Sequence, residues 1–230
     1  SKNKQNNKAI YHCQRFIETL PDKRDAKFKD DNLATVYNNL AVSFKDTGLF
    51  EKAEANFQSA IKKDVTFAAA YNNYGNLLND QARLPEARDR FVKAIELDPE
   101  DHIAYWNLHS TATSSSQAQA IIEQCISKSP TDEIALFTLA GLQAFDGNSH
   151  AFKELIRFGF SEEPLVRSIA WILSLPNSPS VFFNRWAMYD YAISISEQSR
   201  TFYEYGVWMG DSFKYLVPHF SHGFGFDTFQ

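Results

Sequence analysis

The chain has 230 residues, of which 44% are hydrophobic and 22% are charged. Nine glycines and eight prolines are too few for a collagen-like or low-complexity chain, and the hydrophobic content excludes a wholly disordered one. The longest nearly apolar run, residues 134–142, falls far short of the ~20 residues that a membrane-spanning helix needs. The first ten residues, SKNKQNNKAI, contain no apolar stretch and do not resemble a secretory signal. We therefore expect a folded cytoplasmic protein that has no membrane partner.

The formal net charge is −5, yet residues 1–30 carry eight basic side chains against four acidic ones. The remainder is therefore strongly acidic, which argues against a nucleic-acid partner. Cys13 and Cys125 lie 112 positions apart with no paired-Cys motif, so neither a disulfide scaffold nor a metal site is expected. His219 and His222 have no third ligand near them, and no GxSxG, HExxH or phosphate-loop motif occurs. We expect no metal and no independent catalytic site.

A repeat of 34 residues dominates the first two thirds of the chain. The segment YNNLAVSF, starting at Tyr37, is followed by YNNYGNLL at Tyr71 and by YWNLHSTA at Tyr105. Within a unit, residues spaced by four and then three positions fall on one helix face, first before and then after a polar break. In the first two units these trios are Tyr37, Ala41 and Phe44; Ala53, Phe57 and Ala60; Tyr71, Gly75 and Leu78; and Ala87, Phe91 and Ala94. Each unit is therefore predicted to be an antiparallel helical hairpin, in which the small residue allows close approach and the aromatic residue fills the gap.

This pattern resembles the tetratricopeptide repeat, a helical hairpin of 34 residues. The resemblance covers full repeats at 34–67 and 68–101, a repeat at 102–132 that lacks three residues near 114–117, a degenerate repeat at 133–160 and half a repeat at 1–21. It implies a predominantly all-α fold, an α-solenoid in which stacked hairpins form a superhelix with a concave groove.

Asparagines recur at one place in three predicted first helices, at Asn39, Asn73 and Asn107. In tetratricopeptide arrays this position faces the concave surface, and the resemblance is closest to arrays whose asparagines hold a peptide main chain. A primary amide both donates and accepts, so it can bond the N–H and C=O of an extended peptide whatever its side chains. Three more asparagines extend the predicted peptide-binding lining: Asn38, Asn72 and Asn76. The alternative is that asparagine is merely tolerated there or bonds to the next hairpin.

A carboxylate clamp for anionic C-termini would need Lys or Arg spread along these first helices. Only Lys45 is placed for that role, because the equivalent residues are Asn79 and Thr113. We therefore expect no preference for anionic C-termini.

After the repeats, residues 161–200 predict two linking helices separated by Pro176, Asn177 and Pro179. This region is rich in aromatic residues, namely Trp171, Phe182, Phe183, Trp186, Tyr189 and Tyr191. We expect them to form a docking core between modules rather than a ligand cage.

Residues 201–230 predict a strand, a glycine turn, a helix and a second strand, which is the start of a βαβ unit. Glu204, Gly206 and Gly210 resemble the first motif of class I S-adenosylmethionine-dependent methyltransferases. The wider segments YEYGVWMGDSFKYL and GFDTF are similar to the macrocin O-methyltransferase group. The resemblance implies that the two glycines form the turn at the cofactor, that Glu204 lies beneath it and that Asp227 holds the ribose.

A methyltransferase domain of this class needs many more residues than the sequence provides before it stops at Gln230. We therefore expect a truncated domain that neither binds S-adenosylmethionine nor transfers a methyl group. Two short strands leave exposed edges. We expect the segment either to pack against the helices at 163–196 or to pair with a second chain, giving a homodimer.

Two functions fit these features. The first is a noncatalytic interaction module that binds an extended peptide or a partner protein in its groove and needs no cofactor. The second is the N-terminal part of an O-methyltransferase whose repeats recruit the substrate.

Overall fold

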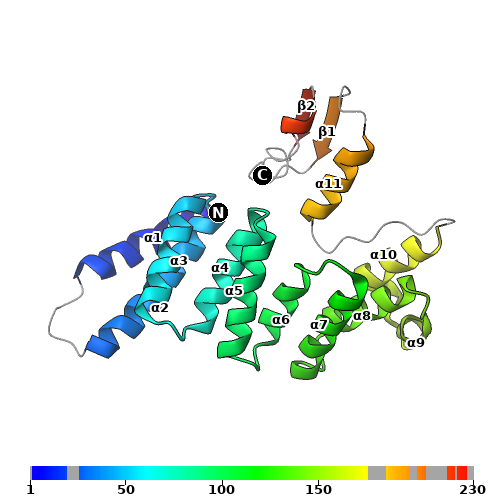
Figure 1. Cartoon of the computed structure of the whole chain (residues 1–230), viewed down its shortest axis with the longest axis horizontal. Helices are drawn as coiled ribbons and strands as arrows, with labels where there is room; N and C mark the ends of the chain where they lie inside the picture. Colours follow the sequence, from blue (N-terminus) through cyan, green and yellow to red (C-terminus); the bar gives the residue numbers. More distant parts are fainter. Residues whose placement is uncertain are drawn as a thin grey trace. The chain divides into compact units, whose positions relative to one another are not determined.

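The computed structural model describes residues 2–19, 26–175, 185–196, 201–205, 217–220 and 222–226. The chain divides into two compact units, Ser1–Phe183 and Asn184–Gln230. The elements of the first unit are α1 (Lys2–Thr19), α2 (Ala26–Asp46), α3 (Phe50–Lys63), α4 (Ala68–Asp80), α5 (Leu84–Leu97), α6 (His102–His109), α7 (Ser115–Lys128), α8 (Glu133–Phe145), α9 (His150–Arg157), the 3-10 helix η1 (Phe160–Glu162) and α10 (Pro164–Leu173) (Figure 1). Those of the second unit are α11 (Arg185–Ile195), β1 (Thr201–Tyr205), the 3-10 helix η2 (Val217–His219) and β2 (His222–Phe226).

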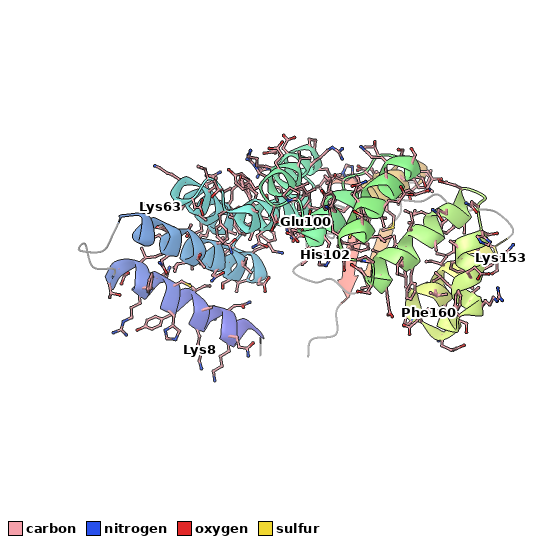
Figure 2. The ribbon with its side chains drawn as sticks, turned by 90° about the horizontal axis from the view of Figure 1, so that it is seen from below. Lys8, Lys63, Glu100, His102, Lys153 and Phe160 are labelled. Atoms are coloured by element: carbon pink, nitrogen blue, oxygen red, sulfur yellow. The ribbon has the colours of Figure 1, made fainter. Side chains whose placement is uncertain are left out.

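The helices of the first unit stack as hairpins of consecutive helices. α2 packs against α3, α4 against α5, α6 against α7 and α8 against α9, and neighbouring hairpins also touch. α1 packs against α2, and α10 packs against α8. Figure 2 shows the side chain of Lys8 on the side of α1 that faces away from α2. Within its described residues the first unit is a helical solenoid, as the repeats predict.

A glycine and a phenylalanine set the distance between α4 and α5. A Cβ atom built on Gly75 would lie 2.5 Å from Cε1 of Phe91, much closer than nonbonded carbon atoms approach. The ring of Phe91 is fully buried, so it has no free space into which it could move. The other residues of the predicted trios are buried too, except Tyr37, which is half-buried. The close approach that the sequence predicts is therefore present.

The turn inside a hairpin has the same form in three of the hairpins. Its central residue adopts a left-handed backbone, with φ of 77° at Gly48, 63° at Ala82 and 93° at Gly147. The next N–H then donates to a carbonyl five residues back, from Leu49 to Phe44 at 2.9 Å, from Arg83 to Leu78 at 2.9 Å and from Asn148 to Gln143 at 2.8 Å. This is the Schellman motif, which satisfies carbonyls at the end of a helix. Alanine is the unfavourable residue among the three, because its Cβ crowds the carbonyl in this conformation.

The third hairpin is short because its first helix ends early. α6 has 8 residues, whereas α4 has 13. α7 starts at Ser115, and the side chain of Ser114 caps it by accepting from the N–H of Gln117 at 3.2 Å. The side chain of Gln117 accepts from the N–H of Thr113, the residue before the cap, at 2.9 Å, so both side chains hold backbone N–H groups at the start of α7. α6 is five residues shorter than α4, and the connection that follows, residues 110–114, is two residues longer than residues 81–83. The three missing residues are therefore lost between the end of α6 and the start of α7, ahead of most of the 114–117 segment that the sequence indicated.

Trp171, one of the aromatic residues of the predicted docking core, does not join the buried core of its own unit. α10 buries Val166 and Ile169 against α8 and α9, but the side chain of Trp171 is 65% exposed. In the second unit, Trp186 on α11 is buried and lies edge-to-face with Tyr189, with ring centroids 6.1 Å apart. Of the other aromatic residues of the predicted docking core, Tyr191 is exposed, and Phe182 and Phe183 lie outside the described residues.

The second unit contains a two-stranded sheet in which β1 and β2 are parallel. A parallel pair needs a crossover connection, and the predicted crossover helix falls within residues 206–216, which lie outside the described part of the chain. Gly206, Gly210 and Asp227 also lie outside it, and of Glu204 only the backbone in β1 is described. The predicted βαβ unit is thus not supported beyond this pair of strands.

Among the described residues, none of the helices combines the length and the apolar character needed to cross a membrane.

The contact between Gly75 and Phe91 predicts a large loss of stability on Gly75→Leu. Leucine gains helix propensity, but its side chain must displace a fully buried ring, so we expect the free energy of unfolding to fall by ~1 to 3 kcal/mol or more. Chemical denaturation measures this. In a Phe91→Ala background the same substitution should cost clearly less, because the cavity receives the new side chain. An equal cost in both backgrounds would show that the two residues do not meet.

The left-handed turn predicts that Ala82→Gly stabilises the protein. Removing the Cβ relieves ~1 to 2 kcal/mol of backbone strain, and the entropic cost of glycine takes back ~0.5 to 1 kcal/mol. We expect a net gain of about 1 kcal/mol in the free energy of unfolding. The matched control is Ala55→Gly at an exposed position inside α3, which should lose about 1 kcal/mol. A loss in both variants would contradict the turn geometry.

Candidate functional site

The six predicted asparagines lie on α2, α4 and α6, which are neighbours in the stack. We call the side of these helices that carries Asn39, Asn73 and Asn107 the amide face. Asn39 is exposed, whereas Asn73 and Asn107 are half-buried. Asn38 and Asn72 are buried, at 6% and 7% exposure. The repeat thus places an exposed or half-buried amide beside a buried one on both α2 and α4.

Two amide–amide hydrogen bonds join the first helices across the hairpin junctions. Nδ2 of Asn73 donates to Oδ1 of Asn38 at 3.0 Å, and Nδ2 of Asn107 donates to Oδ1 of Asn72 at 2.9 Å. Each bond spans 35 residues. Asparagine bonding to the next hairpin, the alternative left open by the sequence, is therefore what these four side chains do.

These bonds use only part of each amide. A primary amide has two N–H groups and a carbonyl oxygen that accepts twice. Asn73 and Asn107 each donate one N–H to the asparagine of the preceding hairpin. Within the described residues, no hydrogen bond reaches the carbonyl oxygen of either side chain. The junction bond nevertheless fixes the plane of the amide. Asn39 receives only a long contact, 3.4 Å, from Nδ2 of Asn38, and Asn76 is half-buried.

Trp106 ends the row of buried asparagines. It occupies on α6 the place of Asn38 and Asn72, and its half-buried ring lies 4.3 Å from that of His109, measured between centroids. Nδ1 of His109 contacts the backbone carbonyl of Trp106. Burial lowers the pKa of His109, and the contact with this carbonyl only partly opposes the effect. The imidazole is therefore neutral at pH 7 and adds no charge to the amide face.

Lys45, the cation that the sequence places on this side, forms an ion pair within the chain. Nζ of Lys45 lies 3.1 Å from a carboxylate oxygen of Asp80, in an ion pair between α2 and α4. This pair also spans 35 residues, like the two amide bonds. Sequence reasoning compared residues 34 apart and so missed Asp80 as the partner. The available signal was complementary side chains at a spacing of 35.

A second polar network joins α3, α4 and α5. Glu54 accepts from the hydroxyl of Tyr74 at 2.5 Å and from Arg83 at 2.8 Å, and Arg83 also binds Glu86. Burial acts to raise the pKa of Glu54, but the hydrogen bonds from Arg83 and Tyr74 outweigh it, so this pKa is lowered. Burial and the Glu54 bond raise the pKa of Tyr74. The network fastens the first two hairpins together, and no sequence motif had indicated it.

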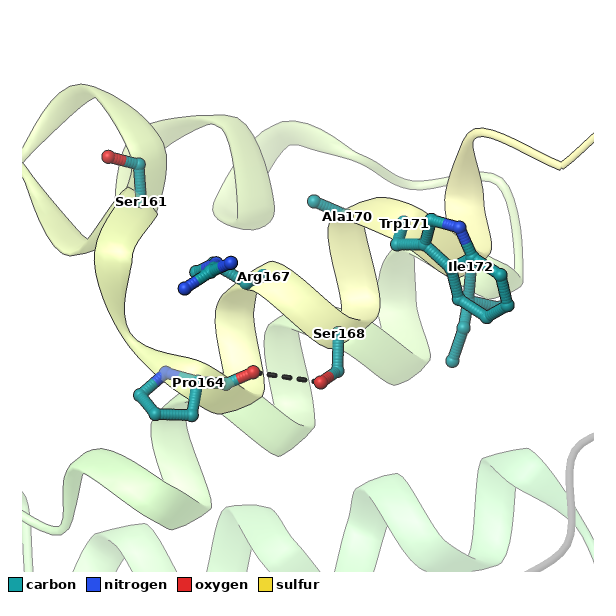
Figure 3. Close-up of a pocket in the computed structure, with 7 residues that line it drawn as sticks. All are labelled: Ser161, Pro164, Arg167, Ser168, Ala170, Trp171 and Ile172. Carbon is teal, nitrogen blue, oxygen red and sulfur yellow. Dashed lines mark hydrogen bonds between the residues drawn. The ribbon is translucent and has the colours of Figure 1, made fainter.

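The described residues contain no group of three or more His, Cys, Asp or Glu side chains that could hold a metal ion. Burial raises the pKa of Cys125 to about 11, so its thiol is protonated and unreactive. A depression of about 750 Å³ beside α10 is lined by Arg167 and Trp171 among others. There the hydroxyl of Ser168 donates to the carbonyl of Pro164 at 2.8 Å (Figure 3).

Comparison with known proteins identifies the hairpins. Residues 34–62 and 68–101 match the family model described as tetratricopeptide repeat. The chain contains tetratricopeptide repeats. No curated protein matches the sequence.

Two solved structures show the same fold over a larger part of the chain. The crystal structure of MamA is 18% identical and aligns over 70% of this chain and 86% of its own, with a TM-score of 0.52. A structure of pilF from Pseudomonas aeruginosa is 17% identical and aligns over 81% of this chain and 98% of its own, with a TM-score of 0.50. These comparisons give no support to the methyltransferase resemblance of residues 201–230.

Proposed function

We propose that the tetratricopeptide repeats bind an extended segment of a partner protein along the amide face. Asn39, Asn73 and Asn107 contact the main chain of the segment, and Asn76 adds to the lining. Asn38 and Asn72 act behind them by holding the neighbouring amides in place. Because amides recognise the peptide backbone, the binding is tolerant of the partner's sequence.

The observation that carries this proposal is the orientation of the junction amides. A side chain that is already held in one plane loses little further conformational entropy when it binds a ligand. The bonds from Asn73 to Asn38 and from Asn107 to Asn72 provide this restraint and leave a carbonyl oxygen and an N–H of each donor residue for a ligand. Lys45, the cation that the sequence places on this side, is paired with Asp80, which disfavours selection of an acidic C-terminus by this lysine.

Alanine variants of the adjacent residues Asn39 and Asn38 distinguish an effect on peptide binding from an effect on stability. A phage-displayed random peptide library supplies the probe, and calorimetry with a selected synthetic peptide gives the dissociation constant. Asn39→Ala should weaken binding about 5-fold for each lost hydrogen bond of about 1 kcal/mol, with the melting temperature unchanged. Asn38→Ala should lower the free energy of unfolding by about 1 kcal/mol, because it removes the junction acceptor.

The triple variant of Asn39, Asn73 and Asn107 to Ala tests the whole face. Unchanged affinity in this variant would remove the asparagines from the mechanism. Failure of the wild type to select any peptide would contradict the proposed function itself.

A second candidate keeps the repeats but joins them to an enzyme, as a recruiting module of an O-methyltransferase. The observation that favours it is the parallel pairing of β1 and β2, because the two strands of a βαβ unit run in the same direction. In that reading Glu204, Gly206, Gly210 and Asp227 belong to a cofactor site that further strands complete.

For the chain of 230 residues we expect no saturable binding of S-adenosylmethionine, because the cofactor pocket of such an enzyme needs later strands. Isothermal calorimetry measures this directly. Micromolar binding by the wild type that is lost in Glu204→Gln would contradict the expectation and place the enzyme function first. Weak heats that are equal in both proteins would agree with it.

A further inference from the structure

Each first helix carries a residue one turn before its asparagine, or before Thr138 at the equivalent place on α8. The four positions are Thr35 before Asn39, Ala69 before Asn73, Ile103 before Asn107, and Ile134 before Thr138 on α8. Residues four apart lie on the same face of a helix. On α2, α4 and α6 this row therefore borders the amide face, and Ile134 has the same place on α8.

This row changes from small and polar to large and aliphatic along the stack. Thr35 and Ala69 stand at the α2 and α4 end, whereas Ile103 and Ile134 are 51% and 58% exposed on α6 and α8. A single exposed isoleucine is ordinary on a protein surface. Here two occupy the same register position on α6 and α8. Trp106, which stands at the place of the buried asparagines, follows Ile103 by three positions on α6.

The spacing of the helices matches an extended chain. Packed helices lie ~8 to 10 Å apart, and an extended peptide rises ~3.3 Å per residue, so about three peptide residues span one helix to the next. Since side chains of an extended peptide alternate in direction, a segment whose backbone reaches Asn107 can turn a side chain toward Ile103. Ile103 is continuous with the amide face because it lies one turn before Asn107 on α6, and Ile134 has the same place on α8, the first helix of the next hairpin.

We propose that Ile103 and Ile134 select an aliphatic or aromatic side chain in the extended segment that the amide face binds. This inference rests on the proposed function and adds its specificity. The neutral His109 beside Trp106 and the internal pairing of Lys45 with Asp80 leave apolar burial as the main source of discrimination. The partner segment therefore carries its apolar side chain at the α6–α8 end of the face.

The test uses the whole chain and the phage-displayed random peptide library. Peptides selected by the wild type should share one aliphatic or aromatic position, and replacing that residue by alanine in a synthetic peptide should weaken binding ~10-fold or more. In the double variant Ile103→Gln with Ile134→Gln, the same alanine peptide should bind almost as well as its parent. The matched control is Val92→Gln, which changes an exposed β-branched residue on α5 and should keep the wild-type preference.

The outcomes separate this inference from the proposed function. Selected peptides without a common apolar position, or an equal alanine penalty in the wild type and the double variant, would overturn the role of the two isoleucines while leaving peptide binding in place. Failure of the wild type to select any peptide would overturn both. Equal melting temperatures of the variants show that folding is not the cause of any change.

Discussion

The whole stack depends on how closely two helices of one hairpin approach each other. In the second hairpin, the missing Cβ of Gly75 gives the ring of Phe91 its place, and Ala41 is fully buried at the same place in the first. If these helices separated, the first helices would move relative to their neighbours. The side chains that join one hairpin to the next would then lose their partners.

Those junctions share one geometric rule. Asn38 with Asn73, Asn72 with Asn107, and Lys45 with Asp80 are all 35 residues apart, although the repeat has a period of 34. Equivalent residues therefore do not face each other; each contacts the residue that follows the equivalent one. As a result, the two adjacent asparagines of a repeat have different tasks, because the first receives the bond from the next hairpin and the second donates to the previous one.

Much of the fold could be predicted from the sequence, because the residues that pack inside a hairpin are spaced three or four positions apart along each helix. The trios around Ala41, Gly75, Phe57 and Phe91 reveal which faces are buried. The asparagine row was also visible, but the division between buried and exposed members was not, because it depends on the angle between hairpins. The 35-residue offset, and with it Asp80, follows from that same angle.

Other differences come from local chemistry that competes with the repeat. The N-terminal cap made by Ser114 and Gln117 starts α7 three residues early, so the deletion falls before α7 rather than inside it. Trp171 lies on the exposed side of α10, because Val166 and Ile169 fill the side that packs on α8. An aromatic composition alone does not tell which face of a helix is buried.

The early end of α6 has a consequence for the segment that the repeats are proposed to bind. With a rise of ~1.5 Å per residue, the 8 residues of α6 span ~12 Å, whereas the 13 residues of α4 span ~20 Å. If the amide face binds a segment as proposed, this segment has less helix beside it at α6 than at α4. The last five residues of α4, which include Asp80, have no helical counterpart on α6.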